Sequence, residues 1–352
     1  MLLSILLFIL VLCTAIIFHE FGHLLVAKKA GVEIESFGIF FPPRIAKLFT
    51  WKGTNFYLNS IPLGGYVQPK VINGASSIEL TTPFRKVAIY LAGVTANLVL
   101  AFLCFFSYFA MVGTPDENKM QVDMIYPNSP ALEAGVQVGD ILYSLDGEPV
   151  FNTTGMGKIL KNGQEHILTV IRGGEEIPLK IVPRWNDELN KSAIGVTVSP
   201  PLVKQPVWTA AASSFDATWS SFVSILEFPV DMVNNLLHPA PATPSEEAAT
   251  DENAEFVGLI GMFDIFTGYM EPGGKTPVFF QVLVFFASLN VSLAGFNILP
   301  IPGLDGGHIL LTLPEFFHRK LSNRAKGLIT LTGLAFVFIL GLIVNLGDII
   351  GF

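Results

Sequence analysis

Four long apolar stretches dominate the pattern of hydrophobic and polar positions along the chain. They cover residues 2–27, 86–112, 277–300 and about 327–350. At 1.5 Å per residue, the first stretch forms a helix roughly 40 Å long, which is enough to cross the hydrocarbon core of a bilayer. The pattern therefore predicts a polytopic α-helical membrane protein with about four transmembrane helices.

A secretory signal peptide is an alternative interpretation of the first apolar stretch. Such a peptide has a basic segment before its apolar run and a small-residue cleavage site after it. No Lys or Arg precedes residues 2–18, no A-x-A site follows them, and the apolar character continues to about Ala27. We therefore expect this stretch to be retained as a membrane helix.

Basic residues between the stretches predict the orientation of the helices. They gather in the loop between the first two stretches and in the loop between the last two. The first loop holds Lys28, Lys29, Arg44, Lys47, Lys52, Lys70, Arg85 and Lys86, and the second holds Arg319, Lys320, Arg324 and Lys326. By the positive-inside rule both loops face the cytoplasm, so both termini and residues 113–276 face the other side.

Two regions between the helices have the alternation and turn residues typical of β-strands. Residues 33–72 predict β-hairpins that dip into the membrane near the first helix, with a short cytoplasmic sheet as the alternative. Residues 120–198 predict a soluble β-rich domain in which strand, short helix, tight turn and strand follow one another. A later hairpin is expected around Gly173-Gly174.

The region after the β-rich domain has a different pattern. Residues 205–237 are amphipathic and carry an aromatic stripe, which indicates a helix that packs against the protein or lies on the membrane surface. Residues 238–255 are rich in Pro, Ala, Thr and Glu, and they predict a flexible linker.

The composition supports the membrane interpretation and argues against one class of partner, nucleic acid. The chain is 51% hydrophobic and 14% charged, whereas an ordinary soluble chain is about 25% charged. The net charge of -8 argues against nucleic acid as a partner. Cys13 and Cys104 both lie in apolar runs and are expected to be packing residues without a disulfide.

The first apolar stretch contains the motif His19-Glu20-Phe21-Gly22-His23. On a helix this H-E-x-x-H spacing places both imidazoles on one face, one turn apart, where they can bind a single zinc ion. The neighbouring Glu20 can then take a proton from a water molecule. Two unrelated helical histidines are the alternative. Because an ionisable residue at mid-bilayer costs on the order of 3 kcal/mol, three at one place favour the metal site.

A catalytic zinc site needs a third protein ligand, and Asp305 is the expected one. It lies in the run Asn297-Ile298-Leu299-Pro300-Ile301-Pro302-Gly303-Leu304-Asp305-Gly306-Gly307-His308, whose prolines predict that the third membrane helix is broken near its end. Asp305 and His19 each follow a comparable apolar stretch that enters from the non-cytoplasmic side, so both reach a similar depth. His308 is a rival ligand, but its nearness to the cytoplasmic loop favours a polar interfacial role.

Four motifs in this order resemble the site-2 protease family, in particular the bacterial RseP-type enzymes. They are H-E-F-G-H, G-G-Y-V, S-P-A-x-x-A-G and N-x-x-P-x-P-x-L-D-G-G-H, and the resemblance covers nearly the whole chain. It implies a Zn²⁺ site held by His19, His23 and Asp305, with Glu20 as the general base. It also implies that Asn297 positions substrate or stabilises the oxyanion, with Asn290 assisting.

The resemblance also implies a division of the chain. Residues 1–112 would be an N-terminal membrane core, 113–200 a PDZ domain, 201–276 the amphipathic stretch and linker, and 277–352 a C-terminal membrane core. The run Gly64-Gly65-Tyr66-Val67 would belong to a membrane-associated β-element that clamps substrate by strand addition.

The function implied is hydrolysis of peptide bonds within the transmembrane segments of single-span proteins in a bacterial plasma (inner) membrane. Anti-sigma factors and remnant signal peptides are the expected substrates. A membrane PDZ scaffold that has lost catalysis and a metal transporter are the alternatives. All four catalytic residues are present, and further polar membrane residues along a path are lacking, so neither alternative is favoured. The chain departs from relatives at Ala92-Gly93-Val94-Thr95-Ala96-Asn97 and Gly258-Leu259-Ile260-Gly261, where they have prolines.

Overall fold

The computed structural model divides the chain into two compact units. One unit, here called the helical unit, comprises Met1–Tyr108 and Ala211–Phe352, and the other, the β-rich unit, comprises Phe109–Ala210. The structure describes residues 2–116, 118–150, 156, 159–186, 191–237, 258–270 and 276–350. The linker predicted for 238–255 lies outside these described residues.

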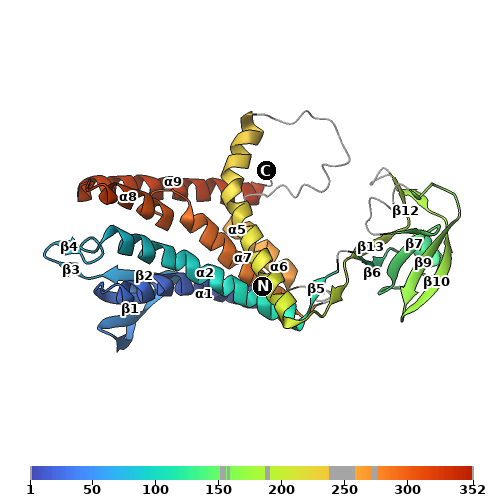
Figure 1. The fold of residues 1–352 in the computed structure, drawn as a ribbon, viewed down its shortest axis with the longest axis horizontal. Helices are drawn as coiled ribbons and strands as arrows, with labels where there is room; N and C mark the ends of the chain where they lie inside the picture. Colours follow the sequence, from blue (N-terminus) through green and yellow to red (C-terminus); the bar gives the residue numbers. More distant parts are fainter. Residues whose placement is uncertain are drawn as a thin grey trace. The chain divides into compact units, whose positions relative to one another are not determined.

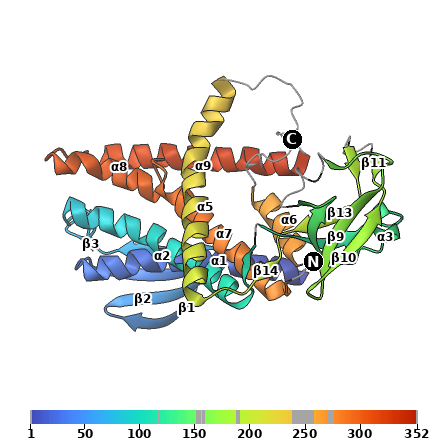
Figure 2. The ribbon, with the colours of Figure 1, turned by 45° about the vertical axis from the view of Figure 1, so that its right-hand side comes forward.

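Among the described residues, four helices of the helical unit are long and apolar enough to cross a membrane (Figure 1). They are α1 (Leu2–Lys29), α2 (Pro83–Met111), α7 (Val278–Ile298) and α9 (Asn323–Ile350). The four spans expected from the apolar pattern are therefore confirmed in length and composition. Figures 1 and 2 both show α1 and α2 running side by side.

The break predicted at the end of the third span is confirmed. Helix α7 ends at Ile298, and a short turn leads to α8 (Asp305–Phe316). Glycines allow α8 to start close against this turn: a Cβ on Gly306 would lie 2.0 Å from the Ile298 carbonyl oxygen, and one on Gly307 would lie 2.1 Å from that of Ile301. The D-G-G sequence is thus needed to place Asp305 at the start of a helix that abuts the end of α7.

Two further helices lie in the helical unit, and the sequence analysis missed one of them. Helix α5 (Val207–Leu237) covers the predicted amphipathic stretch. Its aromatic residues Phe215 and Trp219 are exposed, whereas the small residues Ser214 and Thr218 are buried. This part of the stripe therefore faces outward, whereas Phe222, further along the helix, is buried. Helix α6 (Leu259–Tyr269) was not predicted, because its 11 residues are too few to span a bilayer.

The predicted hairpin region forms strands β1 (Ile34–Trp51) and β2 (Thr54–Pro69), followed by the short pair β3 (Val71–Ile72) and β4 (Ala75–Ser76). Strands β1 and β2 are antiparallel and joined at Lys52 and Gly53, which both have positive φ, as a tight hairpin turn requires. The first part of β1 pairs with both ends of β2: Phe37 lies opposite Phe56 and Val67. The run Gly64–Val67 therefore forms one edge of this sheet.

The β-rich unit is a small sheet around its own apolar core. Its central strands are β6 (Met120–Ile125), β7 (Ile141–Leu145), β9 (His166–Arg172), β10 (Glu175–Ile181) and β13 (Val196–Ser199), in the order β10-β9-β7-β6-β13. Helix α3 (Pro130–Glu133) lies between β6 and β7, as the sequence predicts. The hairpin predicted at Gly173-Gly174 is confirmed as β9–β10. Shorter strands are β5 (Thr114–Pro115), β8 (Glu148–Pro149), β11 (Arg184–Asn186), β12 (Lys191–Ala193) and β14 (Leu202–Val203).

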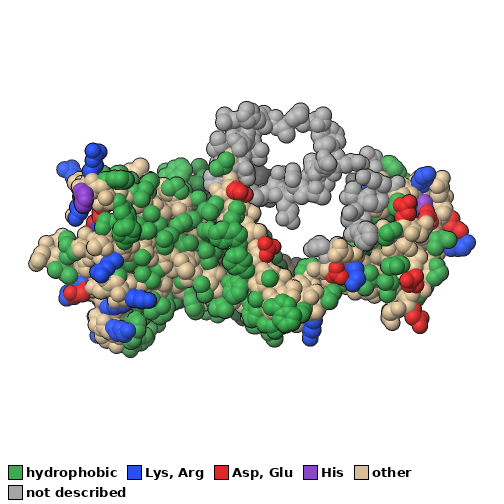
Figure 3. Space-filling model, viewed as in Figure 1, with side chains coloured by type: hydrophobic (Ala, Val, Ile, Leu, Met, Phe, Trp, Pro, Cys, Tyr) green, Lys and Arg blue, Asp and Glu red, His purple; other side chains and the backbone are tan. Residues whose placement is uncertain are grey.

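Basic side chains gather at one end of the helical unit, where β3, β4 and the turn between α8 and α9 lie (Figure 3). Hydrophobic side chains cover most of the rest of its visible face. Lys86 is an exception among the basic residues counted in the loops, because it is only 1% exposed and is paired with acidic residues. It therefore adds no free surface charge to the first loop. Cys13 and Cys104 are both buried, as expected for packing residues, and are free cysteines.

Candidate metal centre

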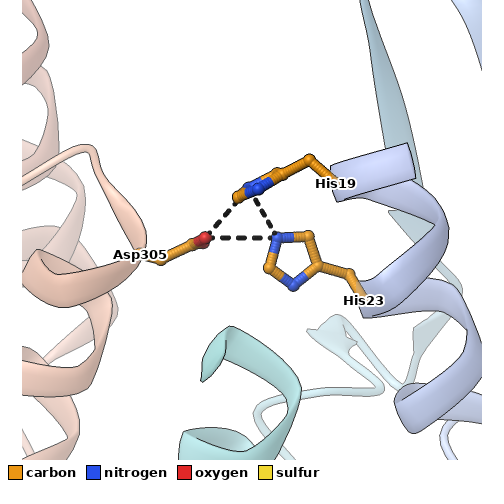
Figure 4. Close-up of side chains that lie close together, drawn as sticks. All are labelled: His19, His23 and Asp305. Carbon is orange, nitrogen blue, oxygen red and sulfur yellow. Dashed lines mark hydrogen bonds and ion pairs between the residues drawn. The ribbon is translucent and has the colours of Figure 1, made fainter. Parts of the chain in front are cut away.

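Three side chains from two distant helices converge at one point in the helical unit (Figure 4). His19 and His23 project from α1, one turn apart, and Asp305 is the first residue of α8. Nε2 of His19 lies 3.0 Å from Oδ2 of Asp305 and 3.1 Å from Nε2 of His23. Nε2 of His23 lies 3.3 Å from the same oxygen. The structure thus brings together the three predicted ligands.

These three atoms suit a zinc ion. The ligand atoms of a tetrahedral zinc ion lie about 3.3 Å apart, because its bonds to nitrogen and oxygen are about 2.0–2.1 Å long. Oδ2 of Asp305 is buried and has no well-aligned hydrogen-bond donor, which is costly unless a cation fills the place. Among the described residues, this is the one group of His, Cys, Asp and Glu with metal-ligand geometry, and His308 is not part of it.

Helix α2 holds His23 in the orientation that a ligand needs. Nδ1 of His23 donates a hydrogen bond to the Ile89 carbonyl oxygen at 2.7 Å, which leaves the lone pair of Nε2 free for a metal. The same helix passes the imidazoles at Gly93, where a Cβ would lie 2.4 Å from Nε2 of His23 and 2.7 Å from Cε1 of His19. Neither Ile89 nor Gly93 is recognisable from the sequence as a supporting residue, because their closeness to α1 depends on helix packing.

Glu20 lies between the two histidines and the edge of the β1–β2 sheet. The backbone N–H of Val67 donates a hydrogen bond to its carboxylate. A Cβ on Gly65 would lie 3.4 Å from Cγ of Glu20 and 3.1 Å from the Gly38 carbonyl oxygen. A glycine there permits this close approach. The structure therefore brings Gly64, Gly65, Tyr66 and Val67 next to the expected general base, as an edge strand with no second partner strand among the described residues.

The two predicted asparagines lie on α7 in different environments. The amide of Asn297 donates to the Leu293 carbonyl oxygen, and its side chain is half-buried. The amide of Asn290 donates to the Phe286 carbonyl oxygen and is fully buried. Asn297 is thus accessible near the end of α7, whereas Asn290 is enclosed by the core. Contact of either residue with substrate stays a prediction.

A cluster of four charged residues lies at the basic end of the helices. Nζ of Lys86 lies 3.0 Å from Oε2 of Glu79 and 2.8 Å from Oε2 of Glu315. Nζ of Lys326 bonds the same two carboxylates, at 2.9 and 2.8 Å. Burial alone would raise the pKa of Glu79, but hydrogen bonds from Lys326 and Lys86 lower it overall. This charged cluster joins the starts of α2 and α9 to the end of α8.

A cavity of about 390 Å³ lies beside the charged cluster. Glu79, Lys326, Tyr90 and His308 contribute to its walls, and the rings of Tyr90 and His308 stack with centroids 5.2 Å apart. His308 therefore lines a mostly apolar cavity next to the charged cluster.

Comparisons with known proteins agree with this geometry. The family model described as Peptidase family M50 matches residues 7–340. A protein of Campylobacter jejuni named "Putative zinc metalloprotease" is 29% identical, over 97% of this chain and 92% of its own length. One of Clostridium perfringens with the same name is 31% identical, over 95% of each chain. Among solved structures, the PDZ domain of an SdrC-like protein from Listeria monocytogenes is 18% identical and covers 23% of this chain and 87% of its own, with a TM-score of 0.21.

Proposed function

The chain belongs to Peptidase family M50, the site-2 protease family, and we propose that it hydrolyses peptide bonds within the membrane-spanning segments of other proteins. Membership of this family and the zinc metalloprotease names of its relatives identify a membrane metalloprotease. Beyond this identification, we propose where the cleaved bond lies, which residues take part in the reaction and which kind of protein is the substrate.

One observation carries the proposal. The three ligand atoms of His19, His23 and Asp305 converge within 4.8 Å of one another. The histidines lie on α1, whose composition suits a bilayer, and Asp305 follows the end of α7, which also suits one. Along α1, His19 and His23 lie about 9 to 15 Å before the last helical residue, Lys29, at 1.5 Å per residue. This position along α1 supports the proposal that membrane segments, rather than soluble peptides, are the substrates.

In the proposed reaction, each group around the site has a separate role. A zinc ion, when bound, supplies a Lewis acid that acidifies water and polarises a carbonyl group. Glu20 accepts the proton from the attacking water and returns it to the leaving amine nitrogen. The edge strand Gly64–Val67 holds an unwound substrate segment by strand addition, with its backbone next to Glu20. Asn297 positions this segment or stabilises the oxyanion.

The proposed substrates are single-span membrane proteins such as anti-sigma factors, or remnant signal peptides. The length and apolar character of the four spans support a location in a lipid bilayer, and the family resemblance favours the bacterial plasma membrane. The β-rich unit, expected to be a PDZ domain, would either recognise a new C-terminus or restrict the size of the substrate.

The test is cleavage of a model transmembrane substrate by the purified full-length protein. We expect Glu20→Gln to lower the rate at least about 100-fold, because the general base is lost. We expect the same variant to retain zinc, since Glu20 is not a ligand. Asp305→Ala should lose both zinc and activity, because two histidines alone hold the ion weakly.

Three outcomes would contradict the proposal. They are full activity in Glu20→Gln, activity that survives rigorous zinc removal, and unchanged zinc content in Asp305→Ala. A folded wild-type protein that binds zinc but cleaves no membrane segment would favour the catalytically inactive scaffold instead.

A further inference from the structure

The second nitrogen of His19 faces a buried asparagine on α2. Nδ1 of His19 lies 3.4 Å from Nδ2 of Asn97, and the Asn97 side chain is fully buried. The amide oxygen, Oδ1 of Asn97, has no hydrogen-bond partner. Among the described residues, His19 is the only hydrogen-bond partner of this amide.

The two asparagines of α7 behave differently. Asn290 and Asn297 each donate to the carbonyl oxygen four residues earlier on their own helix. Such a bond pairs the amide nitrogen without help from another helix, although Oδ1 of Asn290, like that of Asn97, has no hydrogen-bond partner. Asn97 instead directs its amide across to α1. An unpaired polar atom in a membrane helix is costly, so the direction of this side chain needs an explanation beyond packing.

The protonation of His19 supplies this explanation. A neutral imidazole carries one proton, and Nε2 can bind a metal only if that proton is on Nδ1. With Nδ2 of Asn97 facing Nδ1, the amide donates and the proton of His19 would sit on Nε2, facing Asp305. Rotating the amide by 180° places Oδ1 against Nδ1 in the same volume. Oδ1 then accepts a hydrogen bond from Nδ1–H, and Nε2 is free.

We infer that Asn97 is a positioning residue that fixes the metal-binding tautomer of His19 by accepting a hydrogen bond from its Nδ1–H. Helix α2 then orients both histidines of α1, through the Asn97 side chain for His19 and the Ile89 carbonyl oxygen for His23. Gly93 lies between these two contacts and allows the helix to come close enough to make them. This inference rests on the zinc site of the proposed function.

The test measures zinc affinity in the full-length protein, by competition with a chelator, and does not depend on cleavage. Asn97→Leu has a similar volume but cannot accept a hydrogen bond, so its zinc dissociation constant should rise about 10- to 100-fold. Asn97→Asp keeps an acceptor oxygen and should bind zinc at least as tightly as the wild type. The control is Thr95→Val, on the same helix, whose exposed hydroxyl bonds only to the Leu91 carbonyl oxygen.

Two results would overturn the inference. One is wild-type zinc affinity in Asn97→Leu, and the other is an affinity in Asn97→Asp at least tenfold weaker than in the wild type. If Asn97→Leu does not fold, the result for Asn97→Asp decides. A Co²⁺-loaded protein adds a spectroscopic measurement, because a displaced His19 ligand changes the visible absorption of the ion in Asn97→Leu and not in Thr95→Val.

The proposed function and this inference fail in different ways. If the wild-type protein binds no zinc, the proposed zinc site fails and the inference fails with it. If the wild type binds zinc and cleaves its substrate while Asn97→Leu keeps full zinc affinity, only the role of Asn97 is wrong.

Discussion

One residue that constrains the metal centre is a glycine, which has no functional group of its own. A Cβ on Gly93 would lie 2.4 Å from Nε2 of His23, well inside contact distance. We therefore expect Gly93→Ala to push the imidazoles apart and to lower both zinc content and cleavage at least tenfold. Elemental analysis of the purified protein measures the metal. Gly341→Ala on α9 is the matched control, because a Cβ there meets open space. Full zinc occupancy in Gly93→Ala would show that the imidazoles can move without losing the ion.

At the scale of single residues, the expected metal ligands could be predicted from the sequence, but the residues that orient and accommodate them could not. His19, Glu20 and His23 are recognisable because their spacing is local to one helix, and Asp305 because its surrounding motif is long. Ile89 acts through its backbone carbonyl, which any residue would offer, so nothing in the sequence marks it. Gly93 resembles any small residue in a membrane helix until the position of α1 is known.

At the scale of the helices, the charged cluster is the feature with the clearest energetic consequence. The side chains of Lys86 and Glu315 are 1% and 2% exposed. Lys86→Met would leave Glu315 with Lys326 as its remaining cationic partner, and removing one member of a buried charge pair costs about 3–5 kcal/mol. We expect a correspondingly lower free energy of unfolding, measured by denaturant titration in detergent micelles. The control, Lys70→Met, breaks a pair with Glu33 that is exposed on both sides and should change stability little. Equal stability of the two variants would contradict this view of the cluster.

The membrane-spanning helices could be predicted from the sequence, because the length and hydropathy of a segment determine whether it can cross a bilayer. All four spans are found within a few residues of their expected limits. Helix α6 was missed because a mainly apolar segment of 11 residues fits neither a membrane span nor an amphipathic surface helix. The outward orientation of Phe215 and Trp219 on α5 was also unpredictable, since an aromatic stripe packs inward or outward depending on what covers it. Lys86 was counted as a loop charge because its buried partner Glu315 lies 229 residues away in the sequence.

For the whole molecule, the distribution of charge predicts which side of the membrane each loop faces. Basic side chains gather at one end of the helical unit, and positively charged loops stay in the cytoplasm. The turn between α8 and α9 should therefore be cytoplasmic, while the β-rich unit, which lies between α2 and α5 in the chain, should be on the opposite side. The two natural cysteines are buried, so a single introduced cysteine can report the location of each loop.

Labelling with a membrane-impermeant maleimide distinguishes the two sides. Glu175→Cys places a thiol on the exposed β9–β10 hairpin, and Lys320→Cys places one in the exposed turn before α9. In right-side-out membrane vesicles we expect labelling of Glu175→Cys alone, and in inverted vesicles labelling of Lys320→Cys alone. Labelling of both from one side would require an even number of crossings between them and would contradict the four-span arrangement, in which α7 alone lies between them. A reversed pattern would keep the spans and place the metal centre near the extracytoplasmic surface, where a different set of substrate segments would reach Glu20.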